Sequence, residues 1–184
     1  MAIAFQKIGI IGAGAWGTAL AIALQAAGRD VKIWAREEAV VQFINTRHEN
    51  AEFLHGVMLD PAIRAVDDFS ALSDCQLILL CPPAQHMGTI CKSLAGLAAK
   101  TAPLVICSKG IDAQSGALMH EIVAAAMPGR PFAALSGPTF ASEVAKGLPA
   151  AIVVASPAEE LAKAVAESVS GPYLRPYTAT DIVG

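Results

Sequence analysis

A glycine-rich turn between a strand and a helix constrains the fold of this chain more than any other feature of its sequence. The run Gly-Ala-Gly-Ala-Trp-Gly begins at Gly12, directly after the apolar segment Lys7–Ile11 and before an apolar helical pattern over Thr18–Ala27. In this setting Gly12 permits the tight turn, Gly14 lets a diphosphate approach the backbone, and Gly17 lets the helix pack closely on the strand. Free N–H groups at the start of a helix also attract an anion. The pattern predicts dinucleotide binding, with a turn that only packs as the alternative.

The end of the next predicted strand, Val31–Trp34, bears on which dinucleotide would bind. Enzymes that use NAD usually place an acidic residue there, roughly 20 residues after the glycines, to bind the ribose hydroxyls. Here Ala35 and Arg36 follow the strand, and a guanidinium can pair with the 2′-phosphate of NADP. Glu37 and Glu38 come next and could accept the ribose hydroxyls if the loop turned differently. The sequence therefore favours NADP and leaves NAD open.

Composition and charge narrow the function classes. Of the 184 residues, 54% are hydrophobic and 16% are charged, which suits a sheet covered by helices on both faces. The net charge of −3 gives no electrostatic reason to expect nucleic acid as a partner. No apolar run reaches the roughly 18–20 residues of a membrane span, and the N-terminus lacks a signal-peptide pattern, so we expect a cytoplasmic protein. The cysteines form no CxxC pair, which predicts reduced thiols and no metal site.

Strand-like and helix-like segments alternate along the rest of the chain. This alternation predicts an α/β fold with a doubly wound, mainly parallel, Rossmann-like sheet, formed as one domain over residues 1–184. The irregular polar stretch His48–Pro61 is interpreted as an excursion outside the core. Further strands are expected at Ile63–Val66, Gln76–Cys81, Leu104–Ser108, Phe132–Ser136, Ala150–Ala155 and Tyr173–Pro176. Further helices are expected at Glu37–Arg47, Gln85–Ala98, Gly116–Met127, Thr139–Lys146 and Pro157–Val169.

Several residues follow predicted strands, at the carboxyl edge where such a sheet binds ligands. Cys81 and the two prolines after it would form a stiff wall or simply end their strand. Lys109 would place an ammonium in the cleft, where it can bind a substrate hydroxyl or phosphate. Pro138 and Thr139 suit the start of a helix, with Gly137 giving clearance, and the N–H groups that follow suit an anion or a polar substrate group, although Thr139 could be only the cap. His86 is interpreted as a surface histidine rather than a proton carrier.

Five segments in order along the chain match the pattern of one enzyme family. They are the glycine turn with the start of its helix, Trp34–Arg36, Ser108–Ile111, Ser136–Ala145 and Tyr177–Asp181. Through them the chain resembles the bacterial NAD(P)-dependent glycerol-3-phosphate dehydrogenases, and Trp16 and the Ser136–Ala145 segment are the most specific signals. The resemblance implies reversible hydride transfer between NAD(P)H and dihydroxyacetone phosphate, which gives sn-glycerol 3-phosphate for phospholipid synthesis.

The motif and the resemblance together predict which residues form the site. The predicted cofactor-binding residues are Gly12, Gly14, Ala15, Trp16, Gly17, Arg36, Lys109 and Ala141. The predicted substrate-binding residues are Lys109, Gly137 and Thr139. The expected partner is a small phosphorylated triose, and the chain could also form a homodimer.

Two departures from the family limit the comparison. Where the family commonly has a Tyr-Leu-Pro-Gly run, this chain has Phe53–Gly56. The family's catalytic lysine and phosphate-binding arginine belong to a helical second domain, which would lie beyond Gly184. We therefore expect no catalytic residue within 1–184, and a chain that binds NAD(P)H without turnover. The alternatives are another β-hydroxyacid or ketopantoate-type reductase, which would share the turn and the sheet, and a non-catalytic nucleotide-sensing module.

Overall fold

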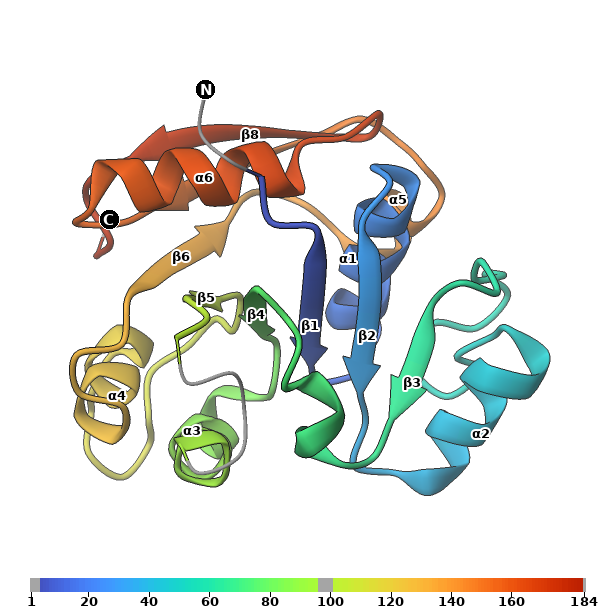
Figure 1. The fold of residues 1–184 in the computed structure, drawn as a ribbon, viewed down its shortest axis with the longest axis horizontal. Coiled ribbons are helices and arrows are strands. Elements are labelled where there is room, and N and C mark those ends of the chain that lie inside the picture. The colour runs from blue at the N-terminus through green and yellow to red at the C-terminus, as the bar shows by residue number, and fades with distance from the viewer. Residues whose placement is uncertain (1–3, 96–100, 184) are drawn as a thin grey trace.

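An eight-stranded sheet forms the centre of the computed structural model, which describes residues 4–95 and 101–183 (Figure 1). The strand order is β3-β2-β1-β4-β5-β6-β7-β8, and neighbouring strands are parallel except β6 and β7. The strands are β1 (Lys7–Ile11), β2 (Asp30–Trp34), β3 (Arg64–Val66), β4 (Leu77–Leu80), β5 (Leu104–Ile106), β6 (Phe132–Ser136), β7 (Ala150–Ala155) and β8 (Leu174–Ala179). The predicted doubly wound, mainly parallel sheet is therefore confirmed.

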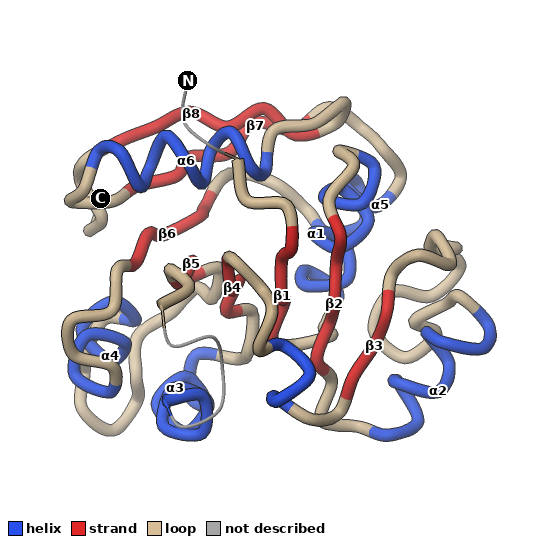
Figure 2. Tube along the Cα trace, in the orientation of Figure 1, coloured by secondary structure: helices blue, strands red, loops and turns tan. Residues whose placement is uncertain are grey.

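Helices cover both faces of this sheet. Figure 2 shows α3 and α4 together beside β4 and β5, while α6 runs along β7 and β8 and α1 lies against α5. The α-helices are α1 (Ala15–Ala26), α2 (Glu38–Arg47), α3 (Met87–Ala95), α4 (Met119–Ala126), α5 (Ala141–Ala145) and α6 (Glu159–Val169). Two short 3-10 helices, η1 (Phe69–Leu72) and η2 (Ala84–His86), precede β4 and α3.

The central strands are buried on both faces, which explains their continuous apolar sequences. In β4, Leu77 and Leu79 pack into the core under α1, whereas Ile78 and Leu80 pack into a second core with α3 and α4. Successive side chains of a strand point to opposite faces, so a strand between two helical layers needs apolar residues at every position. Because β1, β4 and β5 are neighbours and parallel, their carboxyl ends lie side by side.

The boundaries differ from the sequence prediction in a few places. Helix α1 begins at Ala15, earlier than the predicted Thr18, because Gly14 is its N-cap. Helix α4 begins at Met119 rather than Gly116, since Gly116 has a φ of +70° and the segment before the helix forms a bridge to residue 111. Strand β8 extends to Ala179. The helix predicted to run to Ala98 is described only to residue 95, and its last part lies outside the described residues.

The polar composition of residues 48–61 predicted an excursion outside the core. The structure shows instead that this stretch packs against the core. Leu54 and Leu59 are buried and belong to the core cluster under α1, and Asn50 is 1% exposed. Leu54 and Leu59 fold this loop back onto the core, so its Asn50 is brought under the glycine turn.

Several features predicted from composition can be compared with the structure. None of the described helices is long and apolar enough to cross a lipid bilayer. All four cysteines are free thiols. Among the described residues there is no group of three or more His, Cys, Asp or Glu side chains placed to hold a metal ion.

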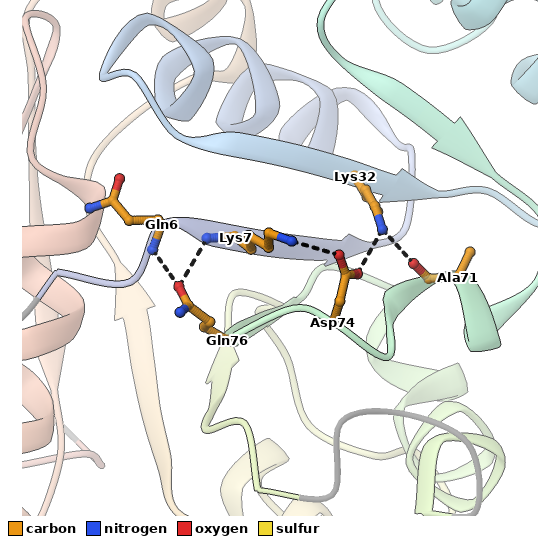
Figure 3. Close-up of polar contacts among 6 residues, drawn as sticks. All are labelled: Gln6, Lys7, Lys32, Ala71, Asp74 and Gln76. Atoms are coloured by element: carbon orange, nitrogen blue, oxygen red, sulfur yellow. Dashed lines mark hydrogen bonds and ion pairs between the residues drawn. The ribbon is translucent and has the colours of Figure 1, made fainter.

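A polar network ties β1, β2 and β4 together near the start of β1 (Figure 3). Asp74, just before β4, accepts hydrogen bonds from Lys7 Nζ at 3.1 Å and Lys32 Nζ at 2.7 Å. Gln76 Oε1 accepts the backbone N–H of Lys7 at 3.2 Å. The bonds from Lys32 and then Lys7 lower the pKa of the Asp74 carboxyl to about 2.

We expect Asp74→Asn to lower the free energy of unfolding by less than about 1 kcal/mol at neutral pH, because this carboxylate is partly exposed to solvent. Since the folded-state pKa lies below the ordinary 3.8, ionised Asp74 stabilises the fold above that pH. Its contribution is lost as the pH falls towards about 2. Urea unfolding at several pH values measures this difference, with Glu52→Gln as a surface control. A difference that does not shrink in acid would contradict the assignment.

Candidate nucleotide-binding site

A cavity of about 750 Å³ lies at the carboxyl ends of β1, β2, β4 and β5. This is the edge at which doubly wound sheets bind ligands, and the volume is in the range of small-molecule sites. The cavity is lined by residues 12–17 after β1, Trp34, Arg36 and Glu37 at the end of β2, Phe53, residues 81–84 after β4, His86, Thr89 and Ile90, residues 107–109 after β5, and residues 139–141 at the start of α5. All the predicted cofactor-binding residues line this cavity.

The three glycines of the turn are needed for different reasons. Gly12 has a φ of +108°, and a Cβ there would stand 2.8 Å from the Cys81 carbonyl oxygen. A Cβ on Gly17 would stand 2.0 Å from the Gly12 carbonyl oxygen, so α1 could not pack on β1 at this distance with a larger residue. A Cβ on Gly14 would meet no protein atom within 4 Å. The packing of the protein itself therefore requires Gly12 and Gly17, whereas Gly14 leaves open space beside the backbone.

The start of α1 is arranged to receive an anion. Gly14 is its N-cap with extended backbone, and no side chain caps the helix within the described residues. Ala15, Trp16 and Gly17 form the first turn and line the cavity. Because the first N–H groups of a helix lack partners inside the helix, a ligand in this cavity can accept hydrogen bonds from them.

Two buried polar atoms of cavity-lining residues also lack partners. Trp16 Nε1 and Thr139 Oγ1 make no hydrogen bond to the described part of the chain. Buried polar groups are nearly always paired, so an unpaired donor at a cavity wall is suited to a bound ligand. Together with the open space at Gly14, these atoms fit a dinucleotide.

Arg36, which the sequence predicts to recognise a ribose 2′-phosphate, follows β2 and lines the cavity. Its side chain is 74% exposed, and Nε and Nη2 both donate to Glu37 Oε1, at 2.9 and 2.6 Å. Glu38 does not line the cavity and accepts a hydrogen bond from Gln42 Nε2 at 3.0 Å. Of the two acidic residues that follow Arg36, Glu37 therefore faces the candidate ligand.

Two of the three predicted substrate residues, Lys109 and Thr139, line the cavity, and the third, Gly137, is bonded to Lys109. Lys109 Nζ donates to the Gly137 carbonyl oxygen at 2.9 Å. Gly137 is not among the lining residues, and a Cβ there would stand 2.8 Å from the Ala151 carbonyl oxygen of β7. The alternative that Thr139 caps the helix is wrong, because Phe140 is the N-cap of α5 and the Thr139 hydroxyl has no partner among the described residues.

The segment after β4 forms one wall of the cavity. Strand β4 ends at Leu80, and Pro82 and Pro83 both line the cavity, so these prolines end the strand and also form the expected wall. The Ser108 hydroxyl donates to the Pro82 carbonyl oxygen, which joins this wall to the residue after Cys107. Burial raises the pKa of the Cys107 thiol well above its ordinary value, so this thiol stays neutral. His86 is exposed at the rim, as expected for a surface histidine.

The sequence reasoning missed Asn50. Its Nδ2 donates to the Ala13 carbonyl oxygen at 2.7 Å and to Thr18 Oγ1 at 2.8 Å, while its Oδ1 accepts the Phe53 N–H at 3.3 Å. Asn50 thus joins the glycine turn to the cavity wall at Phe53. No spacing links this asparagine to a motif 37 residues away, so only the folding back of its loop could reveal it.

Comparison with known proteins identifies the family. The sequence model described as NAD-dependent glycerol-3-phosphate dehydrogenase N-terminus matches residues 7–162. The chain belongs to this family. The resemblance inferred from the five segments is confirmed, and the ketopantoate-type reading is not favoured.

Known relatives of this chain are longer proteins, and the chain matches only part of each. The protein named glycerol-3-phosphate dehydrogenase, NAD(P)+, from Caulobacter vibrioides is 50% identical over 98% of this chain and 54% of its own. The protein of the same name from Paramagnetospirillum magneticum is 50% identical over 97% of this chain and 65% of its own. A crystal structure of glycerol-3-phosphate dehydrogenase from Coxiella burnetii matches 97% of this chain and 55% of its own with a TM-score of 0.90 and 31% identity. The chain therefore spans about half to two thirds of these relatives.

In this family member we expect Asn50→Ala to lower the free energy of unfolding by about 1–3 kcal/mol, because it removes the donor to the buried Ala13 carbonyl and Thr18 hydroxyl. Urea unfolding measures the loss, and hydrogen exchange should become faster in residues 12–18. Asn45→Ala is the matched control, since Asn45 bonds the backbone of Ala65 on β3 at 2.9 Å. It should lower stability without a selective effect on the turn. Equal exchange in the two variants would contradict a specific role for Asn50.

Proposed function

We propose that this chain is the NAD(P)-binding half of a glycerol-3-phosphate dehydrogenase. The observation that carries this proposal is the open backbone at Gly14, which lies at the uncapped start of α1 inside the cavity. Family membership and the names of the relatives support it. Residues 1–184 would act as one nucleotide-binding domain, in a cytoplasmic enzyme, with the second domain supplied by residues outside this chain.

The bound nucleotide would supply the hydride, and the residues of this chain would hold it in place. Ala15 and Trp16, with the glycine turn, would bind the diphosphate through backbone N–H groups. Arg36 would contact the adenosine ribose or its 2′-phosphate. Ala141, at the start of α5, would line the opposite side of the cavity. This arrangement would hold the cofactor along the edge of the sheet.

The substrate end of the proposed reaction needs polar groups for dihydroxyacetone phosphate or sn-glycerol 3-phosphate. Lys109, bonded to the Gly137 carbonyl, would touch both cofactor and substrate through its ammonium. The buried Thr139 hydroxyl, which lacks a partner among the described residues, would bind a substrate oxygen. Proton transfer to the substrate oxygen also needs an acid or base in the closed site. We assign this role to the lysine that the family resemblance places beyond residue 184.

An exposed apolar patch supports the proposal of a second domain. Val153 of β7 and Tyr177 of β8 are neighbours in the sheet register, and they are 43% and 53% exposed. Burying such side chains is favourable, so this face suits a covering element. We propose that the rest of the longer protein covers it, and a homodimer of the isolated chain through the same face remains a prediction.

We expect Gly14→Ala to fold normally and to weaken NADPH binding at least about tenfold, because the new methyl group enters the space that the diphosphate needs. Thermal unfolding and titration calorimetry measure the two effects. Gly88→Ala is the control: Gly88 lies outside the cavity lining, and a Cβ there makes only an ordinary 3.6 Å contact with Ile122. If Gly14→Ala binds NADPH as well as the unchanged chain does, the diphosphate does not lie at this turn.

We expect the isolated chain 1–184 to bind NADPH but to reduce dihydroxyacetone phosphate no faster than a protein-free control. The reason is that one wall of the site cannot both exclude water and supply the proton. The measurement is the loss of NADPH absorbance over time, with the full-length Caulobacter relative as positive control. Steady-state turnover by the isolated chain would overturn the assignment of the proton donor to a residue outside it.

A further inference from the structure

The guanidinium that would recognise a 2′-phosphate is already engaged by a carboxylate. Arg36 Nε and Nη2 converge on Glu37 Oε1, at 2.9 and 2.6 Å, and both residues line the cavity. A guanidinium binds phosphate through the same N–H donors that it offers to a carboxylate. A 2′-phosphate that binds Arg36 at this Nε–Nη2 edge competes with Glu37 for the same donors.

We propose that Glu37 is a specificity-determining residue that lowers the affinity of this site for NADPH relative to NADH. This inference rests on the proposed function of the cavity as an NAD(P)-binding site. The inference adds to the role proposed for Arg36, because the preference between NADPH and NADH would depend on the Arg36–Glu37 pair rather than on Arg36 alone.

The competition discriminates between the nucleotides because only one carries the extra phosphate. An NADPH 2′-phosphate that binds the Nε–Nη2 edge has to displace Glu37 Oε1, and at any edge of the guanidinium it stands near a carboxylate of the same charge, which is unfavourable. NADH has a neutral hydroxyl at this position, and a carboxylate can accept a hydrogen bond from it. Glu37 therefore penalises NADPH and does not penalise NADH.

The backbone around the pair keeps this carboxylate close to Arg36. Glu37 is the N-cap of α2, and its carbonyl oxygen accepts the N–H groups of Val40 at 3.0 Å and Val41 at 3.2 Å. On the other side, the buried Ala35 donates its N–H to the Val66 carbonyl oxygen at 3.0 Å. Arg36 is the more exposed of the two side chains, at 74% against 34% for Glu37. A bound phosphate could draw the guanidinium aside, but Glu37 would remain at the edge of the site.

Glu38 provides a matched control within the same turn. It also lies at the start of α2, so its neutralisation removes the same charge and the same interaction with the helix dipole. Glu38 binds Gln42 and does not line the cavity. Any effect on nucleotide preference that is specific to Glu37 therefore reflects its contact with Arg36 and its place in the site.

The test is the ratio of the dissociation constants for NADPH and NADH, measured by calorimetry on the chain 1–184 and its variants. We expect Glu37→Gln to tighten NADPH binding about fivefold at low ionic strength, the size of an exposed ion-pair interaction, and not to tighten NADH binding. Glu38→Gln should leave the ratio unchanged. The gain should shrink at about 1 M salt, where the Debye length is about 3 Å, and Arg36→Ala in the Glu37→Gln background should abolish it.

The outcomes separate this inference from the proposed function. If the unchanged chain binds both nucleotides but Glu37→Gln leaves the ratio as it was, or shifts it as Glu38→Gln does, Glu37 does not determine specificity and the site assignment stands. If the unchanged chain binds neither nucleotide, the proposed function fails and this inference fails with it. A selective, salt-sensitive gain for NADPH would support both.

Discussion

The close contact between the start of α1 and the end of β1 is the constraint on which the rest of the site depends. A side chain at Gly17 would collide with the Gly12 carbonyl oxygen, and a side chain at Gly12 would collide with the backbone after β4. These two glycines therefore set how closely α1, β1 and β4 approach one another. The first turn of α1 reaches the cavity because no side chain separates these elements, and the open position at Gly14 follows from the same geometry.

Residues far apart in the sequence then complete the cavity. Asn50 binds the carbonyl of Ala13 from a loop that folds back under the turn, and Lys109 binds the carbonyl of Gly137 across the other end. Each side chain donates a hydrogen bond to the backbone carbonyl of another segment, and Asn50 also donates to the Thr18 hydroxyl. The site is thus held open by polar contacts around its border, while the apolar cores on the two faces of the sheet hold the strands.

The sequence predicted the parts of this arrangement that depend on local pattern or on parallel topology. Glycine spacing located the turn, and strand order placed Lys109 at the same edge as the turn, because parallel strands end together. The course of the loop after α2 could not be predicted, since its polar composition hid the buried Leu54 and Leu59. The alternative that Thr139 caps the next helix was also wrong. A threonine before a helix favours capping, but here α5 starts after Phe140.

Substitutions at the two ends of the cavity would affect nucleotide affinity in different ways. At the turn, the proposed binding would depend on backbone N–H groups held by close packing, so a substitution there would alter the fold or block the ligand. At the ribose end, the exposed pair of Arg36 and Glu37 meets solvent, where charges are screened and side chains can rearrange. Nucleotide preference can therefore vary through a few surface charges while the diphosphate cradle stays the same. This division explains how a glycine motif can predict that a dinucleotide binds and still leave open which one is preferred.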